Sequence, residues 1–334
     1  MTIYDQESID PDAANDSHAL LVELVGRDRR VLDVGCSTGY LGEALAARGC
    51  IVDGIEKDPA AAELARERMN DVAVLDLDRD DLAEALAGRQ YDCVVLADVL
   101  EHLADPRRVL ESAVRLLSPD GEVVISVPNV AHGSLRLALL QGRWEYRDTG
   151  LLDRTHIHFF TRTSILDLIQ QGGLAITAVH STVVDPLASE INLDRSSLPQ
   201  ELVDWVRVQE DSFNYQFVIR ARRGVQEGKV PPVEPDAKLP GMDPVRKVGS
   251  EFQGLQTAPG GRDDLRRKVL TLRDYAIGAE AELDQARREL HKARRHLSEV
   301  QGDLTALRRS ASWRVGQILV APLSRIRRMW RGQS

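Results

Sequence analysis

Cysteine is scarce in this chain, with only Cys36, Cys50 and Cys93 among 334 residues. The three thiols show no metal-ligand spacing, so we predict reduced packing residues and neither a disulfide framework nor a zinc site. No apolar run approaches the roughly 20 residues that a membrane-spanning helix requires. The first 16 residues are acidic and polar and lack the basic start and apolar core of a signal peptide. These absences predict a cytoplasmic protein.

Basic residues are fewer than acidic ones over most of the chain, although the formal net charge is only −9. Residues 262–334 hold 17 Lys and Arg against 9 Asp and Glu, whereas the rest of the chain holds 26 against 43. The acidic front part would repel phosphates, so nucleic acid is not expected as a partner. Hydrophobic residues make up 43% of the chain, which is enough for a sizeable core.

Short apolar segments alternate with helical patterns through the first two thirds of the chain. Asp58-Pro59 and Asp105-Pro106 each place a capping carboxylate before a proline, which is typical of a helix start. The alternation predicts an α/β fold with a doubly wound, mostly parallel, Rossmann-like sheet of seven strands. The strands are expected at 31–34, 51–55, 72–75, 91–97, 122–127, 174–184 and 213–220, with a turn at 118–121 and a helix at 161–171.

Changes in composition give the expected borders of the sheet domain. An N-terminal extension and helix at 1–29, with Ser17 as the helix cap, precede a domain at 30–223. This domain carries an insertion at 128–160 that is rich in His, Arg and aromatic residues. It is too long for a plain connection, so we expect it to carry function. Proline, glycine and charge then predict a flexible linker at 224–262.

The remainder of the chain has two distinct patterns. Apolar residues recur at alternating intervals of four and three from Leu265 to Leu307, which predicts a coiled coil at 263–308 and therefore a homo-oligomer. From residue 308 onward there are seven arginines and no acidic residue, interleaved with Trp313, Trp330 and aliphatic residues. We therefore predict that the basic amphipathic tail at 309–334 binds an anionic membrane surface.

The segment VLDVGCSTGY, residues 31–40, organises the first domain. A buried strand ends at Asp33 and leads into a turn with Gly35 and Gly39, and a helix is expected to begin near Thr38. The spacing differs from the G-x-G-x-x-G of dinucleotide binders, and a carboxylate at Asp33 suits a cationic amine. The pattern resembles motif I of class I S-adenosylmethionine-dependent methyltransferases. In that family the loop wraps the methionine end of the cofactor.

The resemblance extends over about residues 30 to 180. Glu56 ends the second strand, where the family holds the ribose hydroxyls, and Asp76 ends the third, where it contacts the adenine. LADVLEHLADP, residues 96–106, looks like the fourth motif of the subgroup that contains the quinone O-methyltransferases. The resemblance implies S-adenosylmethionine as cofactor and these binding residues: Asp33, Gly35, Cys36, Ser37, Gly39, Glu56, Lys57, Asp76, Leu77, Ala97 and Asp98.

Methylation of a hydroxyl group requires removal of a proton, and histidines are the candidate bases. We take His156, His158 and His102 as the catalytic candidates, with His132 as a further possibility. His156 and His158 flank Ile157, so an extended segment would place both on one face; alternatively, either histidine only holds the loop in place.

A metal-assisted reaction is a second interpretation of the same motif. Asp98, Glu101 and His102 resemble the motif with which some RNA-methylating relatives hold a divalent cation, and His158 would complete the set. Asp98 stands where these relatives have glutamate. Many relatives keep Leu-Glu-His without a metal, so no metal is assigned.

The acceptor is inferred from the insertion and the rear of the chain. The DRTHIHFFT segment, the coiled coil and the tail SASWRVGQILVAPLSRIRR resemble bacterial methyltransferases of surface-polysaccharide assembly. This resemblance implies O-methylation of a glycan or glycolipid by a protein peripheral to the inner face of the membrane. The insertion offers side chains suited to a sugar: Arg136, Arg143, Trp144, Tyr146, Arg147 and Arg154. The alternatives are a quinone or other small-molecule O-methyltransferase and a non-catalytic tethered scaffold.

Overall fold

The structure is a computed structural model that describes residues 9–239 and residue 242. The predicted coiled coil, the basic tail and the later part of the predicted linker lie outside the described residues. In the part of the chain that is described, no helix is both long and apolar enough to cross a membrane.

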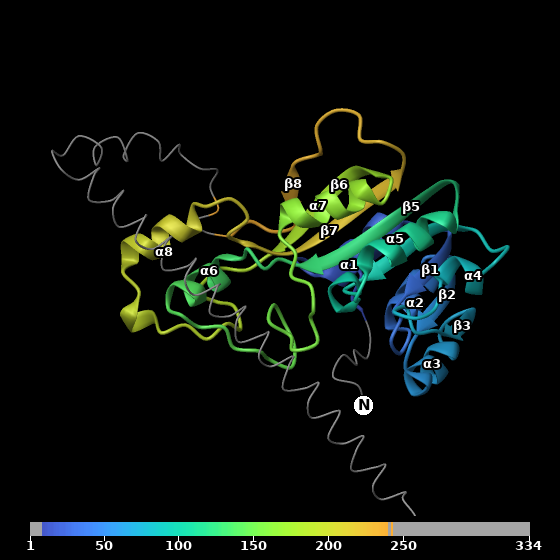
Figure 1. Ribbon diagram of the computed structural model, residues 1–334, viewed down its shortest axis with the longest axis horizontal. Helices are drawn as coiled ribbons and strands as arrows, with labels where there is room; N and C mark the ends of the chain where they lie inside the picture. Colours follow the sequence, from blue (N-terminus) through green and yellow to red (C-terminus); the bar gives the residue numbers. More distant parts are fainter. Residues whose placement is uncertain (1–8, 240–241, 243–334) are drawn as a thin grey trace, which may run out of the picture. The chain divides into compact units, whose positions relative to one another are not determined.

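Eight strands form one sheet in the order β3-β2-β1-β4-β5-β7-β6-β8. Neighbouring strands from β3 to β5 are parallel, β7 runs antiparallel to both β5 and β6, and β8 runs parallel to β6. The prediction of a mostly parallel, doubly wound sheet is confirmed, with one strand more than expected (Figure 1). The strands are β1 Arg30–Val34, β2 Ile51–Glu56, β3 Asp71–Val74, β4 Tyr91–Ala97, β5 Leu117–Pro128, β6 Leu174–Val183, β7 Asn214–Arg223 and β8 Val233–Pro235.

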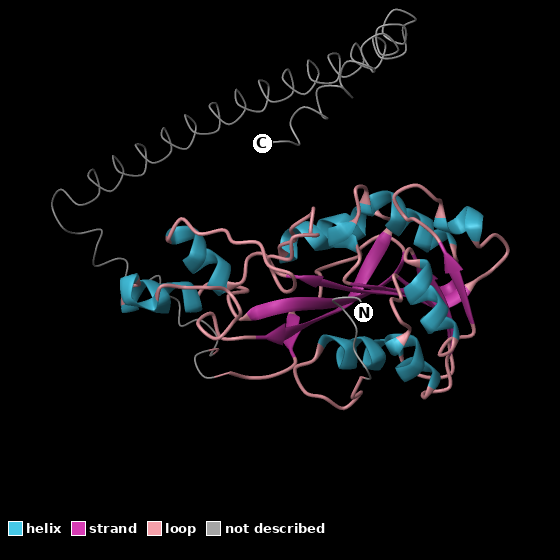
Figure 2. Ribbon diagram, turned by 90° about the horizontal axis from the view of Figure 1, so that it is seen from below, coloured by secondary structure: helices cyan, strands magenta, loops and turns pink. Residues whose placement is uncertain are grey.

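Helices cover both faces of this sheet, as the two views show (Figures 1 and 2). In β4, Cys93 and Val95 pack with α1 and α2, whereas Val94 and Leu96 pack with α4, α5 and α7. Apolar side chains on both faces of a strand are what a central parallel strand requires. The helices are α1 Ser17–Val25, α2 Tyr40–Ala46, α3 Pro59–Arg66, α4 Leu82–Ala85, α5 Pro106–Arg115, α6 Gly133–Leu140, α7 Arg162–Gln171 and α8 Gln200–Arg207.

Three local expectations need correction. The turn predicted at 118–121 lies inside β5, where the pairing shifts register between Tyr91 and Cys93. Gly121 permits this irregularity, because a Cβ there would meet the Tyr91 carbonyl oxygen at 2.9 Å. The cap of α1 is Asp16, whose carboxylate accepts from the Ala19 amide, and not the neighbouring Ser17.

The third correction concerns the segment predicted as a linker from residue 224. Strand β8 lies within it and pairs with β6 from Val179 to Ser181. Val230 and Val233 pack against the larger hydrophobic cluster of the sheet domain. Two apolar residues among prolines and charges were too weak a pattern to predict a strand, yet they suffice at the edge of an existing sheet.

Candidate active site

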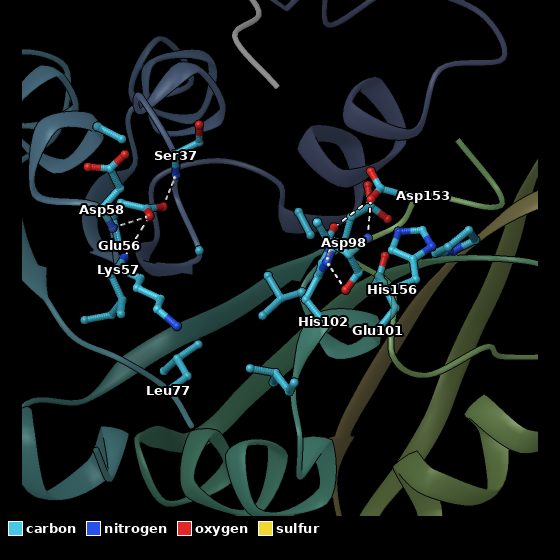
Figure 3. Close-up of a pocket in the computed structure, with 18 of the residues that line it drawn as sticks. Ser37, Glu56, Lys57, Asp58, Leu77, Asp98, Glu101, His102, Asp153 and His156 are labelled. Atoms are coloured by element: carbon cyan, nitrogen blue, oxygen red, sulfur yellow. Dashed lines mark hydrogen bonds between the residues drawn. The ribbon is translucent and has the colours of Figure 1, made fainter. Parts of the chain in front are cut away.

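A cavity of about 760 Å³ lies at the carboxyl ends of the parallel strands. Its lining includes Gly35 after β1 and Asp76 after β3. Figure 3 shows Glu56, at the end of β2, and Asp98, after β4, in the same cavity. Parallel strands all present their carboxyl ends at one edge of a sheet, so residues far apart in sequence meet there. Eight of the eleven predicted cofactor residues and two predicted catalytic histidines, His102 and His156, therefore share one cavity, whereas Asp33, Cys36 and Gly39 do not line it.

The glycine turn is shaped by left-handed backbone conformations. Gly35 has φ 78°, and a Cβ there would meet Val99 Cγ2 at 2.7 Å, so only glycine fits. Ser37 also has positive φ, and both residues line the cavity. Helix α2 begins at Tyr40, two residues later than expected, because Gly39 with φ 84° occupies the cap position.

Two predicted cofactor residues in this turn face the protein instead. Gly39 approaches α3 so closely that a Cβ would lie 3.0 Å from Ala65 Cα. Cys36 is buried in a cluster with Ala62 and Ala65, and burial raises the pKa of its thiol. Neither residue lines the cavity, so we now assign both to the packing of the turn against α3.

Asp33 lies behind the turn as a buried carboxyl group. It is 1% exposed, and its Oδ2 atom has no hydrogen-bond partner. Burial, followed by the negative charge of Glu56, raises the pKa of Asp33 to about 7. A cationic group arriving at this end of the cavity would therefore stabilise the ionised form of Asp33.

The carboxylate of Glu56 is oriented by three backbone amides. Oε2 accepts from the Ser37 amide at 2.9 Å, and Oε1 accepts from the amides of Lys57 and Asp58, each at 2.8 Å. Oε2 retains capacity for a further donor such as a ribose hydroxyl. Beyond it, Lys57 Nζ lies 3.3 Å from Asp76 Oδ1, and Leu77 adds an apolar surface to the lining.

Asp98 occupies the end of β4 next to Ala97, which also lines the cavity. It has φ 53°, and its Oδ1 accepts hydrogen bonds from Ser126 Oγ at 3.0 Å and from Gln216 Nε2 at 2.5 Å. Gln216 comes from the antiparallel strand β7 and was not predicted from the sequence. These contacts, from β5 and β7, fix the position of the Asp98 carboxylate.

A second group of side chains forms the opposite end of the cavity. The rings of His102 and His156 are 4.8 Å apart, and both residues lie beside Glu101. Glu101 is fully buried and neither carboxylate oxygen has a hydrogen-bond partner; burial, then the charge of Asp98, raises its pKa well above the usual value. One donor atom from each residue lies within 4.8 Å of the other two, so the donor set fits a divalent cation.

His102 is oriented by residues of the insertion. Its Nδ1 atom lies 3.0 Å from Thr155 Oγ1, and Thr155 Oγ1 donates to Asp153 Oδ1 at 2.6 Å. Because the hydroxyl has one proton and gives it to Asp153, it accepts from His102, which assigns the imidazole proton to Nδ1. Asp153 and Thr155 were not predicted as site residues, although they belong to the DRTHIHFFT segment that marked the insertion.

Two other candidate bases lie outside the cavity. His158 stacks against Phe160 and contacts the Ala104 carbonyl oxygen at 3.5 Å. The expectation that His156 and His158 share a face is wrong, because the amides of Ile157 and His158 both donate to the Glu101 carbonyl, which an extended chain cannot do. Burial lowers the pKa of His132 to about 4, and its ring nitrogens form hydrogen bonds with the Ser134 hydroxyl and the Val184 carbonyl oxygen.

The basic and aromatic residues that were expected to bind a sugar do not line the cavity. Arg136 donates to the carbonyl oxygens of Ala131 and Glu210, each at 2.6 Å. Arg154 pairs with Asp148 at 2.6 Å. Trp144 packs edge-on against Phe159, with the ring centroids 5.3 Å apart. These contacts hold the insertion together and leave the described lining without an arginine. Arg143, Tyr146 and Arg147 are likewise absent from the lining of the cavity.

The family model of a methyltransferase domain matches residues 8–179, just over half of the chain. The chain belongs to this methyltransferase family. Two relatives are each named as a ubiquinone biosynthesis O-methyltransferase. The one from Alkalilimnicola ehrlichii is 33% identical over 171 residues, which cover 49% of this chain and 68% of the relative. The one from Pseudomonas fluorescens is 33% identical over 178 residues, which cover 52% of this chain and 75% of the relative.

Two solved methyltransferase structures align with part of this chain. Magnesium protoporphyrin IX methyltransferase from Synechocystis, crystallised with bound SAH, aligns with a TM-score of 0.44 at 17% identity, covering 66% of this chain and 91% of that one. A methyltransferase from Archaeoglobus fulgidus aligns with a TM-score of 0.44 at 16% identity, and the alignment covers 62% of this chain and 95% of that one. The family match and the two relatives show that this protein is a methyltransferase.

Several residues that line the cavity of this methyltransferase gave no signal in the sequence. They come from segments that only the fold brings to the site: α1, the insertion and β7. His18 and Ser17 lie in the first turn of α1, and Tyr215 lies beside Gln216 in β7. None of these residues belongs to a sequence motif, so spacing alone could not assign them to the site.

Proposed function

We propose that this methyltransferase O-methylates a phenolic hydroxyl on a quinone-type small molecule. The observation that carries O-methylation is the pair of histidines, His102 and His156, in the same cavity as the glycine turn and Asp98. The relatives named for ubiquinone biosynthesis support the quinone alternative over a glycan. The charged lining supports it too, because it is mostly acidic and includes no described arginine that would attract an anionic glycan.

S-adenosylmethionine, when bound, supplies a methyl group made electrophilic by its sulfonium. The protein has two tasks in such a reaction, namely to hold the acceptor in line and to accept the hydroxyl proton. His156 lies in the cavity, and burial followed by the proximity of His102 lowers its pKa, so it is neutral and able to accept a proton. We assign His156 as the base, with His102 held next to it by Thr155.

The same place also fits a divalent cation, with His156 in the donor set in place of His158 and Asp98. Glu101, His102 and His156 would hold the ion, whereas His158 and Asp98 are not part of the group that the structure brings together. The unpartnered oxygens of Glu101 fit this role. Such an ion would act as a Lewis acid that promotes ionisation of the acceptor hydroxyl.

The other two alternatives have less support. A non-catalytic scaffold is at odds with membership of the methyltransferase family. Glycan or glycolipid methylation rested on the rear of the chain and on the basic, aromatic insertion. The first lies outside the described residues, and the predicted sugar-binding side chains of the second do not line the cavity.

A direct comparison of acceptors tests the proposal. The full-length protein is incubated with methyl-labelled S-adenosylmethionine and either an ortho-dihydroxyphenol with a short apolar side chain or a neutral glycoside of similar size. We expect label on the phenolic oxygen and none on the glycoside, measured by mass spectrometry. Label on the glycoside alone, dependent on His156, would overturn the quinone assignment.

A further inference from the structure

The cofactor brings a carboxylate into a cavity that is already acidic. Its methionine end carries both an ammonium and a carboxylate group. Acidic side chains among the described lining residues are Glu56, Asp58, Asp76, Asp78, Asp98, Glu101 and Asp153. The ammonium suits such a lining, whereas the carboxylate needs a cation or strong hydrogen-bond donors. The position of the available cations therefore decides which way the methionine end can lie.

The cationic or protonatable nitrogen groups of the described lining fall into three places. Lys57 Nζ lies 3.3 Å from Asp76 Oδ1, towards the end of β3. His102 and His156 lie together beside Glu101, at the end assigned to the acceptor. The remaining one is His18, which packs edge-on against Tyr40 with the ring centroids 5.4 Å apart.

Tyr40 locates His18 at the methionine end of the cavity. It is the first residue of α2, directly after the glycine turn. Its side chain lines the cavity together with Gly35 and Ser37 of that turn, and burial followed by the charge of Asp33 raises the pKa of its hydroxyl. His18 thus lies at the end of the cavity where Asp33 is expected to meet the ammonium.

We propose that His18 binds the carboxylate of the cofactor's methionine end. Asp16, which does not line the cavity, lies 4.0 Å from His18 Nδ1 and leaves Nε2 as the atom that meets the ligand. The side chain is 15% exposed, so the contact forms in a partly desolvated site. Helix α1 therefore contributes to cofactor selection as well as to the core. The inference depends on the cofactor and not on the identity of the acceptor.

Two ligands that differ in the amino-acid group test the assignment. S-adenosylhomocysteine carries the carboxylate, whereas 5′-methylthioadenosine has the same adenosine and a thioether but no amino-acid group. By calorimetry on the full-length protein, His18→Ala should weaken S-adenosylhomocysteine by roughly 10- to 100-fold, as expected for a lost hydrogen bond to a charged group. The affinity for 5′-methylthioadenosine should be unchanged.

A matched control comes from the ribose site. Glu56→Gln should weaken both ligands, because both contain the ribose, and His18→Arg should retain most of the affinity for S-adenosylhomocysteine. Melting curves of the ligand-free variants report whether α1 remains folded. If His18→Ala weakens both ligands equally, or neither, the carboxylate is bound elsewhere and the proposal is wrong.

Discussion

Replacing Asp33 with asparagine is expected to stabilise the cofactor-free protein and to weaken its binding of S-adenosylmethionine. The pKa of Asp33 is raised from 3.8 to about 7 in the folded protein, so the folded state resists its ionisation. This penalty is absent below about pH 4, grows as the pH rises towards 7, and is complete above it. Asparagine removes it, so at pH 8 the free energy of unfolding should rise by on the order of 4 kcal/mol at most.

Cofactor binding should respond in the opposite sense. The cationic amine loses its carboxylate partner, so the affinity of Asp33→Asn for S-adenosylmethionine should fall by roughly 10- to 100-fold at pH 8. Below pH 7 the wild-type carboxyl group must first give up its proton to pair with the amine. The ratio of wild-type to variant affinity should therefore decrease as the pH falls from 7 to 5.5. Using this ratio removes contributions that the wild type and the variant share.

Calorimetry and thermal melting at several pH values check both parts of this prediction. Asp76→Asn is a suitable comparison, because Asp76 also follows a strand of the same sheet but is paired with Lys57. It should not stabilise the protein. An affinity ratio for Asp33→Asn that does not vary with pH would show that Asp33 does not meet the amine. A lower melting temperature at pH 8 would contradict the buried, unpartnered carboxyl group.

Removal of the His156 side chain should lower turnover by roughly 10²–10⁴, as expected for loss of a general base. The affinity of His156→Ala for S-adenosylhomocysteine should be unchanged, because His156 is not among the residues assigned to the adenosine or the amino-acid group of the cofactor. His158→Ala is the matched control: it removes the same side chain two residues away but outside the cavity, and it should retain wild-type turnover. Full activity in His156→Ala with loss in His158→Ala would overturn the assignment.

Chelation separates the two ways of activating the acceptor hydroxyl. With His156 as the base, turnover should survive treatment with a chelator. Turnover that is lost on chelation and restored by Mg²⁺ or Mn²⁺ would instead support a cation held by Glu101, His102 and His156. In that case Glu101→Gln should also abolish the metal-dependent activity, because it removes the charged donor while keeping the shape of the side chain.

The ends of the parallel strands were the part of the site that could be predicted from the sequence. Glu56, Asp76 and Asp98 each follow an apolar run that predicts a strand. Because parallel strands have their carboxyl ends at one edge of the sheet, such residues are expected to lie together there. The glycine turn could also be predicted from the sequence, because Gly35 adopts a positive φ that few residues other than glycine adopt. Gly39 shows the limit of the pattern, because its close approach to Ala65 has a packing cause that a motif cannot distinguish from ligand binding.

On the acceptor side the sequence indicated His102 and His156 among four candidate histidines but not which of the four enter the cavity, since that depends on contacts between distant segments. Whether His156 or His158 enters the cavity is decided by two amides that share the Glu101 carbonyl oxygen. The hydrogen bonds from His102 through Thr155 to Asp153 likewise join the turn after β4 to the insertion, and His102 and Thr155 are 53 residues apart. His18 reaches the cavity only because α1 packs against the sheet beside α2. None of these contacts has a local signature in the chain.

A crystal structure of the full-length protein with S-adenosylhomocysteine tests the account most directly. The predicted result is one ligand in the cavity at the carboxyl ends of the strands, with its amine at Asp33, its ribose hydroxyls at Glu56 and its adenine between Asp76 and Leu77. The sulfur should face the space between Asp98 and His156. A ligand bound elsewhere, or one whose adenine lies at the Glu101 end of the cavity, would contradict the assignment of the site.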